Sequence, residues 1–134
     1  MTSFPLQIVT PDGMEFEGMA EEVIVRTTSG DIGILAGHLD CVAPLGMGRA
    51  TVVIDGQKRY AACIGGMISV NSGKVTLVPT TFEWAEDIDS VRAEASYQRA
   101  QEILHNSRAS KTELTRAQAK LRRALVRRSV ASEK

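Results

Sequence analysis

The residues best suited to binding a ligand are arginines in the last third of the chain. Arg92 and Arg99 are seven residues apart, so a helix would present both on one face. Arg123 and Arg127 are four apart and would share a face of a second helix. If two helices bring these four side chains together, their planar guanidinium groups can hold a polyphosphate through paired hydrogen bonds. The alternative is a solvated basic face, with pairs such as Asp89 and Arg92 lying along a single helix.

The helices that would position these arginines begin at an acidic junction. Glu86, Asp87 and Asp89 crowd the start of a segment in which no glycine or proline occurs after residue 84. Carboxylates at a helix start accept hydrogen bonds from free backbone N–H groups and meet the positive end of the helix dipole. The junction therefore predicts a change to helix at Asp87.

The segment 87–134 predicts two helices. Apolar residues at helical spacing define one side of each: Ile88, Val91, Ala95, Ile103 and Leu104 in the first, and Leu114, Ala117, Leu121, Ala124 and Leu125 in the second. Ser110 and Glu113 form a capping box at the start of the second helix. Since only about five residues separate the helices, they must form an antiparallel hairpin. Its alanine-rich, narrow seam predicts a marginally stable hairpin that is separable from the rest of the chain.

Residues 1–86 have the pattern of short strands joined by turns. Pro11-Asp12-Gly13, Asp55-Gly56 and Asn71-Ser72-Gly73 separate runs of alternating or β-branched residues, and Asp55-Gly56 is a type I′ turn signal. The glycine-rich stretch 29–38 fits short strand pieces joined by turns. We therefore predict an α+β protein that is mainly β. It consists of an antiparallel sandwich or barrel of about 8–10 strands in residues 1–86, followed by a helical hairpin in residues 87–134.

Composition narrows the class of protein. Residues 1–84 carry five basic and nine acidic residues, whereas residues 85–134 carry eleven basic and seven acidic ones. The interleaving of acids with bases in the second part, and only six aromatic residues overall, argue against nucleic-acid binding. The N-terminus lacks the features of a signal peptide, and no window approaches the roughly 20 apolar residues of a membrane span. We expect a soluble protein that reaches a membrane only through a partner.

Signatures of catalysis are missing from the sequence. The glycines of 30–37 and 65–66 do not form a phosphate-loop motif, and tight strand corners explain them better. His38 and His105 are the only histidines, which rules out a multi-histidine metal site, and Cys41 and Cys63 lack zinc spacing. We expect both thiols to be reduced core residues. For His38, in a glycine-flanked loop, a surface or interface role is favoured over a role as base or ligand. We expect no catalytic residues and no metal.

Three segments resemble the epsilon subunit of bacterial F-type ATP synthase. They are residues 30–38 (GDIGILAGH), residues 64–70 (IGGMISV) followed by 74–77 (KVTL), and residues 88–93 (IDSVRA). The resemblance extends over essentially the full chain, with the same order of sandwich and hairpin. The stretch Leu39-Asp40-Cys41-Val42 departs from the Ala-Pro-Leu-like continuation common in that family.

The resemblance implies a noncatalytic rotor subunit that couples proton translocation to ATP synthesis. The sandwich would bind the gamma subunit and the membrane c-ring, with Asp31 and His38 at the rotor interface. The hairpin would switch between a compact form and an extended form that reaches the catalytic alpha/beta ring and inhibits ATP hydrolysis. The subunit would lie peripherally at the cytoplasmic face of the bacterial plasma membrane, held there only through the complex.

The same resemblance implies a regulatory nucleotide site. No cofactor is obligatory, and the ligand is ATP, with or without Mg²⁺. The motif that holds the nucleotide in ATP-binding members is matched here by Ile88, Asp89, Arg92 and Ala93. Glu83 would lie on the adenine side, and the phosphates would be reached by Arg99, Arg123 and Arg127.

Two other interpretations differ in class. One is a stand-alone β-sandwich adapter whose helical hairpin grips client chains. The other is a small soluble ATP sensor without a rotary partner. Co-purification with a gamma subunit distinguishes the favoured interpretation from both.

Overall fold

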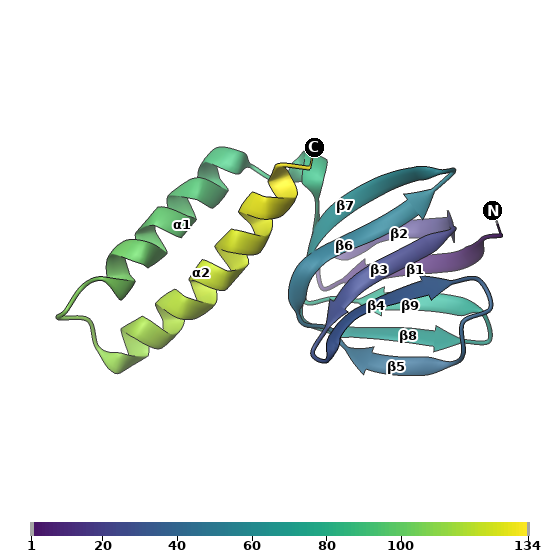
Figure 1. The fold of residues 1–134 in the computed structure, drawn as a ribbon, viewed down its shortest axis with the longest axis horizontal. Helices are drawn as coiled ribbons and strands as arrows, with labels where there is room; N and C mark the ends of the chain where they lie inside the picture. The colour runs from purple at the N-terminus through teal and green to yellow at the C-terminus, as the bar shows by residue number, and fades with distance from the viewer. Residues whose placement is uncertain (1, 134) are drawn as a thin grey trace. The chain divides into compact units, whose positions relative to one another are not determined.

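The computed structural model describes residues 2–133, which form ten strands, one 3₁₀ turn and two helices (Figure 1). The chain divides into two compact units, Met1–Trp84 and Ala85–Lys134. All ten strands belong to the first unit, and the 3₁₀ turn and both helices belong to the second. The predicted sandwich followed by a helical hairpin is confirmed.

The first unit consists of two five-stranded sheets. One sheet has the order β2-β1-β9-β8-β5 and the other β10-β7-β6-β3-β4. The strands span Phe4–Thr10 (β1), Gly13–Ala20 (β2), Glu22–Thr27 (β3), Gly30–Leu35 (β4), Cys41–Pro44 (β5), Met47–Ile54 (β6), Gln57–Ile64 (β7), Met67–Asn71 (β8), Lys74–Val78 (β9) and Thr81–Trp84 (β10).

One strand pairing differs from the antiparallel pattern of the rest. β1 and β9 run parallel, with Leu6 beside Val75 and Ile8 beside Leu77. The other pairings among the described strands are antiparallel. Turn signals predict hairpins between strands that follow each other, but β1 and β9 are far apart in the chain. Their relative direction is therefore left open by the local sequence.

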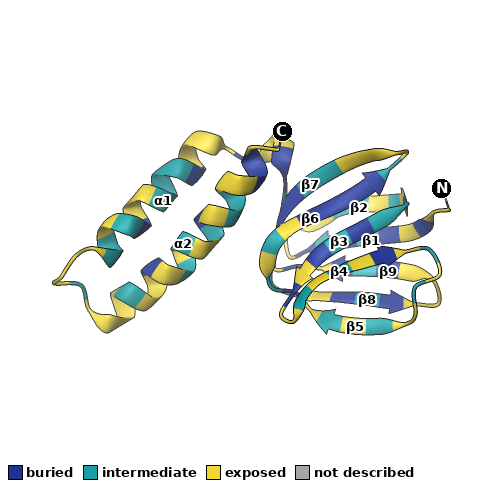
Figure 2. Ribbon diagram, in the orientation of Figure 1, coloured by how far each residue is buried: buried dark blue, intermediate teal, exposed yellow. Residues whose placement is uncertain are grey.

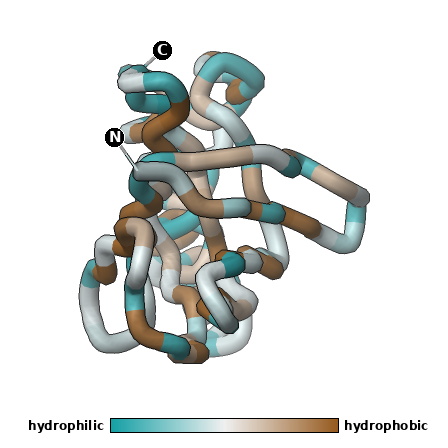
Figure 3. The backbone as a smooth tube through the Cα atoms, turned by 90° about the vertical axis from the view of Figure 1, so that its right-hand side faces the viewer, coloured by the Kyte–Doolittle hydropathy of each residue, from teal (hydrophilic) through white to brown (hydrophobic). Residues whose placement is uncertain are grey.

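The core lies between the two sheets and is built from the inward face of each strand. Buried and more exposed positions alternate along β1, β3, β8 and β9, as a sandwich with one solvated face per sheet requires, and Figure 3 shows short brown, hydrophobic stretches of the chain interrupted by white or teal ones. Fully buried aliphatic side chains come from both sheets, namely Leu6, Ile8, Val23, Val25, Ile34, Val52, Ile68, Val75 and Leu77. Phe82 packs edge-on against Trp84 with ring centroids 4.9 Å apart.

The tight turns follow the sequence signals. Asp55 and Gly56 have φ values of 51° and 77°, and Ser72 and Gly73 have 51° and 83°. Positive φ at both central residues defines the type I′ turn, whose twist matches that of the flanking strands. The turn predicted at Asp55-Gly56 is therefore confirmed.

Gly66 forms a strand corner that a larger residue cannot form. Its φ is 94°, and a Cβ atom there would overlap the carbonyl oxygen of Val78. Its carbonyl oxygen accepts a hydrogen bond from the backbone N–H of Leu45 at 2.8 Å. This geometry supports the interpretation of Gly65-Gly66 as a corner between β7 and β8.

The two cysteines are free thiols in different surroundings. Cys63 is buried, and burial raises the pKa of its thiol to about 12. Cys41 is half-buried, at the start of β5. The prediction of a reduced core residue is therefore confirmed for Cys63, whereas Cys41 is only partly covered.

The second unit is an antiparallel helical hairpin preceded by a 3₁₀ turn. The turn spans Ala85–Asp87, α1 spans Ser90–Leu104 and α2 spans Lys111–Ala131. The predicted capping box is confirmed, because Ser110 Oγ accepts from the backbone N–H of Glu113 at 3.1 Å and Glu113 Oε1 accepts from that of Ser110 at 3.5 Å. Arg128, near the end of α2, contacts Glu94 near the start of α1, so the helices run in opposite directions.

The helix seam is made mainly of alanines, and three of the expected apolar positions, Val91, Ala95 and Leu125, lie outside it. Val91 is 80% exposed and Leu125 is 44% exposed. Ile88 precedes α1, so its three-residue spacing from Val91 does not define a helix face. The buried residues of the two helices are Ala93, Ala100, Ala117, Ala124, Val130 and Ala131. Figure 2 accordingly colours most of both helices yellow or teal.

Candidate functional site

Asp89 caps the first helix of the hairpin. It has extended backbone angles (φ −77°, ψ 102°), and its Oδ1 accepts a hydrogen bond from the backbone N–H of Arg92 at 3.0 Å. The contact therefore joins Asp89 to the main chain of Arg92 rather than to its guanidinium group. On either side of this cap, Ile88 and Ala93 are buried, with exposed fractions of 1% and 0%. The cap fixes where α1 begins and hence which way Arg92 projects.

Arg92 and Arg99 lie on one side of α1, beside the seam. Each directly precedes a seam alanine, Ala93 or Ala100, and successive residues of a helix are about 100° apart around its axis. Both arginines are exposed to solvent. Arg99 Nη2 donates to Ser96 Oγ at 3.2 Å, so this guanidinium group already lies along the helix.

Arg123 and Arg127 lie on the corresponding side of α2. Arg123 directly precedes the seam residue Ala124, Arg127 follows it by three, and both side chains are half-buried. In two antiparallel helices that face each other, the same rotational offset from the seam leads to the same flank. The four arginines Arg92, Arg99, Arg123 and Arg127 therefore share one flank of the hairpin, which we call the arginine flank.

The sequence-predicted site residues are divided between the two units. Ile88, Asp89, Arg92, Ala93, Arg99, Arg123 and Arg127 belong to the hairpin unit, where the arginines share a flank. Glu83 belongs to the sandwich unit, on β10, where it is half-buried and pairs with Ala62 of β7.

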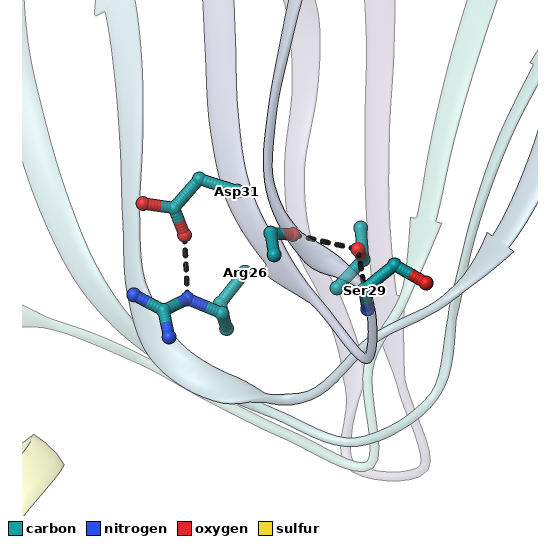
Figure 4. Close-up of polar contacts among 5 residues, drawn as sticks. Arg26, Ser29 and Asp31 are labelled. Carbon is teal, nitrogen blue, oxygen red and sulfur yellow. Dashed lines mark hydrogen bonds and ion pairs between the residues drawn. The ribbon is translucent and has the colours of Figure 1, made fainter.

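The two expected interface residues lie along β4 and the loop that follows it. Asp31 Oδ1 accepts from Arg26 Nε at 2.6 Å, an exposed ion pair across β3 and β4 (Figure 4). The neighbouring turn is closed by Thr27, whose hydroxyl donates to the carbonyl oxygen of Gly30 at 2.6 Å and accepts from the N–H of Ser29 at 3.2 Å. His38 is half-buried, with Nδ1 2.8 Å from the carbonyl oxygen of Leu39.

A contact between the helices was not anticipated from the sequence. The Arg128 guanidinium lies over the Tyr97 ring, 4.3 Å from its centroid, and its Nε is 3.3 Å from Glu94 Oε2. Glu94 and Tyr97 are three residues apart on α1, a spacing that places them side by side. That spacing, with a basic residue in the last turn of the second helix, was the available signal.

An exposed apolar row crosses the outer face of the β2-β1-β9-β8-β5 sheet and was also missed. Pro44 pairs with Met67, Met67 with Val78, and Val9 with Met14. One step beyond Ile8 and Leu77 in the parallel ladder, Val9 comes beside Val78. Met14, Met67 and Val78 are 51%, 42% and 48% exposed. We call Pro44, Met67, Val78, Val9 and Met14 the apolar row. Contiguous exposed apolar side chains of this kind mark interaction surfaces.

Residues 2–133 contain neither a candidate metal site nor a helix suited to spanning a membrane. Among residues 2–133, no three His, Cys, Asp or Glu side chains are grouped as they would be around a metal ion. No helix in the same part of the chain is long and apolar enough to cross a membrane.

Two family models together match nearly the whole chain. The one described as ATP synthase, Delta/Epsilon chain, beta-sandwich domain matches residues 3–85. The one described as ATP synthase, Delta/Epsilon chain, long alpha-helix domain matches residues 86–132. The change from one model to the other falls where the strands end and the helical unit begins.

Curated relatives match along their whole length. An ATP synthase epsilon chain of Bacillus velezensis is 43% identical over 131 residues, covering 98% of each chain. One from Ruminococcus albus is 40% identical over 135 residues, covering 100% of both chains. Among solved structures, a chain of the Euglena gracilis mitochondrial ATP synthase superposes with a TM-score of 0.84 at 20% identity, covering 100% of this chain and 83% of that one.

The fold and these matches define a class of protein: a two-domain subunit with a β-sandwich followed by a helical hairpin. The chain belongs to the ATP synthase delta/epsilon family. Its function is that of an epsilon subunit, a noncatalytic component of ATP synthase. The resemblance noted in the sequence is thereby confirmed.

Asp89→Ala tests the capping role of Asp89, the second residue of the motif in residues 88–93. We expect it to lower the stability of the hairpin by about 1 kcal/mol, because an N-cap side chain satisfies an otherwise unpaired helix N–H. Asp89→Asn should leave hairpin stability almost unchanged, because asparagine caps helices as well as aspartate does. Urea unfolding of the full chain, followed by the helical circular dichroism signal, measures both variants. Equal losses in the two would show that Asp89 does not act as a cap.

Proposed function

We propose that the chain is a rotor subunit of the central stalk that couples proton translocation to ATP synthesis and restrains ATP hydrolysis through a mobile helical hairpin. The observation that carries this proposal is the contrast between its two units. The sandwich has a core of large buried aliphatic side chains, whereas the helices meet mainly through alanines. Burial stabilises by roughly 0.8 kcal/mol per methylene, so an alanine seam holds far less tightly than the sandwich core.

The sandwich is the part that attaches to the rotor. Its apolar row supports binding to a partner with a complementary apolar surface, for which we propose the gamma subunit. Asp31 and His38, on β4 and its following loop, would contact the c-ring. The protein would therefore lie peripherally at the cytoplasmic face of the bacterial plasma membrane, held there by the complex.

The hairpin is the regulatory part, with ATP as its ligand. Two arginines from each helix belong to the arginine flank, and guanidinium is the group best suited to binding phosphate oxygens through paired hydrogen bonds. A ligand that binds only the closed hairpin stabilises it by RT ln(1 + [L]/Kd), or roughly 2.7 kcal/mol at a hundredfold excess over Kd. When ATP is scarce, the second helix would separate and its arginines would pair with acidic surfaces of the catalytic alpha/beta ring.

Arg92→Ala tests the nucleotide site. We expect it to weaken ATP binding roughly 10- to 100-fold, because a hydrogen bond to a charged group contributes about 1.5–3 kcal/mol. Arg122→Ala is the matched control, since Arg122 is exposed and lies on the side of α2 away from the seam. Calorimetric titration of each full chain with ATP and Mg²⁺ gives the affinities. If both variants bind as the parent does, the arginine flank is not a nucleotide site.

Met67→Glu tests the apolar row as the rotor-binding surface. A charge within the row has to be desolvated in an apolar interface, so we expect co-purification with the gamma subunit to fall at least tenfold. Gln57→Glu adds the same charge at an exposed position of β7 in the other sheet and should leave assembly intact. Thermal unfolding of the free variants checks that both sandwiches are folded. Normal assembly of the Met67→Glu variant would place the gamma contact elsewhere.

Removal of residues 87–134 tests the regulatory role of the hairpin. The remaining sandwich keeps its two sheets and its core, and we expect it to fold and to assemble. ATP hydrolysis by the assembled complex should rise, because the inhibitory element is gone. Steady-state ATPase assays of complexes with the full and shortened chains make the comparison. Unchanged hydrolysis would contradict inhibition by this hairpin.

A further inference from the structure

The contact of Arg128 with the first helix has features of a built clasp rather than a chance surface pair. One guanidinium group meets two partners on α1, the Glu94 carboxylate at 3.3 Å and the Tyr97 ring at 4.3 Å. Both partners are themselves positioned by the next turn of α1. Gln98 Nε2 donates to Glu94 Oε1 at 3.0 Å, and Gln101 Nε2 donates to the Tyr97 hydroxyl at 2.9 Å.

This arrangement reduces the loss of side-chain entropy that usually makes an exposed ion pair weak. Long charged side chains lose rotamer freedom when they pair, and an isolated pair at the surface gains little in return. Here the two acceptor groups are already oriented, and the carboxylate and the aromatic ring act on the same guanidinium group. With a seam made mainly of alanines, such a contact is a substantial part of what joins the helices.

The clasp lies on the flank opposite the arginine flank. Arg128 follows the seam residue Ala124 by four positions, and Tyr97 follows Ala93 by four, so both are displaced from the seam in the same rotational direction. The arginines of the arginine flank are displaced from the seam in the opposite direction. A ligand held by the arginine flank would therefore leave the clasp in place. The two devices would close the hairpin side by side instead of competing.

We propose that Arg128, with Glu94 and Tyr97, is a nucleotide-independent clasp that sets what fraction of molecules has a closed hairpin before any ligand binds. Its effect on the apparent ATP affinity follows from the fraction of molecules that are closed. If only the closed hairpin binds ATP, the apparent Kd rises by the factor by which the closed fraction falls. This second consequence rests on the proposed function, whereas the clasp itself does not.

The test measures the closed population of the full chain without nucleotide. Spin labels at Glu102→Cys and Arg122→Cys, in a Cys41→Ser background, report the distance between the two helices. Both label positions are exposed and outside the clasp. Pulsed electron paramagnetic resonance then gives the ratio of short to long distances. Arg128→Gln and Tyr97→Leu weaken the clasp, and Arg108→Gln is the control for loss of one positive charge.

We expect Arg128→Gln to lower the ratio of closed to open hairpin roughly three- to tenfold, as the sum of an exposed ion pair and a cation–π contact implies. Tyr97→Leu should give a smaller fall, and Arg108→Gln none. The swapped pair Glu94→Arg with Arg128→Glu should recover part of the loss. A ratio in Arg128→Gln equal to that of Arg108→Gln would overturn the clasp.

ATP titrations of the same variants separate the clasp from the nucleotide site. Arg128→Gln should weaken apparent ATP affinity by no more than its closed fraction falls, and Arg92→Ala should weaken ATP binding without changing the nucleotide-free ratio. Weaker ATP binding in Arg128→Gln with an unchanged ratio would make Arg128 a ligand residue and overturn the proposal. If the parent chain does not bind ATP, the nucleotide site fails, while the distance measurements still decide the clasp.

Discussion

The alanine seam of the hairpin is the constraint on which the second unit of this protein depends. Buried alanines at seven-residue spacing, Ala93 and Ala100 on α1 and Ala117, Ala124 and Ala131 on α2, let the two backbones approach closely. They also bury little apolar surface, so the free energy that holds the helices together is small. In a helix pair of this kind, polar contacts at the edges of the seam contribute a larger share of the free energy of closure than they would beside a seam of leucines. The arginine flank and the Arg128 clasp are both placed at those edges.

Local signals predicted the elements of the fold well, and long-range relations poorly. Asp55-Gly56 fixed a hairpin because only a few residue types adopt positive φ at both central positions. Ser110 and Glu113 fixed the start of the second helix because each satisfies the other's unpaired N–H group. The parallel pairing of β1 with β9 had no such signal, because the sequence of neither strand indicates which strand it pairs with. The same holds for the apolar row, whose members come from five strands and meet only in the folded sheet.

The candidate site shows the same difference. Spacing within one helix was informative, whereas contacts between the helices could not be predicted from it. The spacing of Arg92 and Arg99, and of Arg123 and Arg127, predicted two shared faces, and the structure has each pair on one side of its helix. The predicted apolar side of the first helix is wrong at Val91, because it includes Ile88 although α1 begins at Ser90. The sequence around Arg128 does not indicate an internal contact, because its partners, Glu94 and Tyr97, are on the other helix. Only the antiparallel packing brings them within reach.

The parallel pairing of β1 with β9 also determines the order in which the protein can take shape as it is synthesised. Leu6 lies beside Val75, so the central pair of one sheet is completed only after nearly the whole first unit has left the ribosome. Until then β1 has only β2 as a partner in that sheet, and an isolated two-stranded hairpin is at best marginally stable in water. The helices are made last and close on themselves through contacts near in sequence, which form quickly. The slow, non-local step therefore belongs to the sandwich, and the helical hairpin is added after the strands of the sandwich have been made.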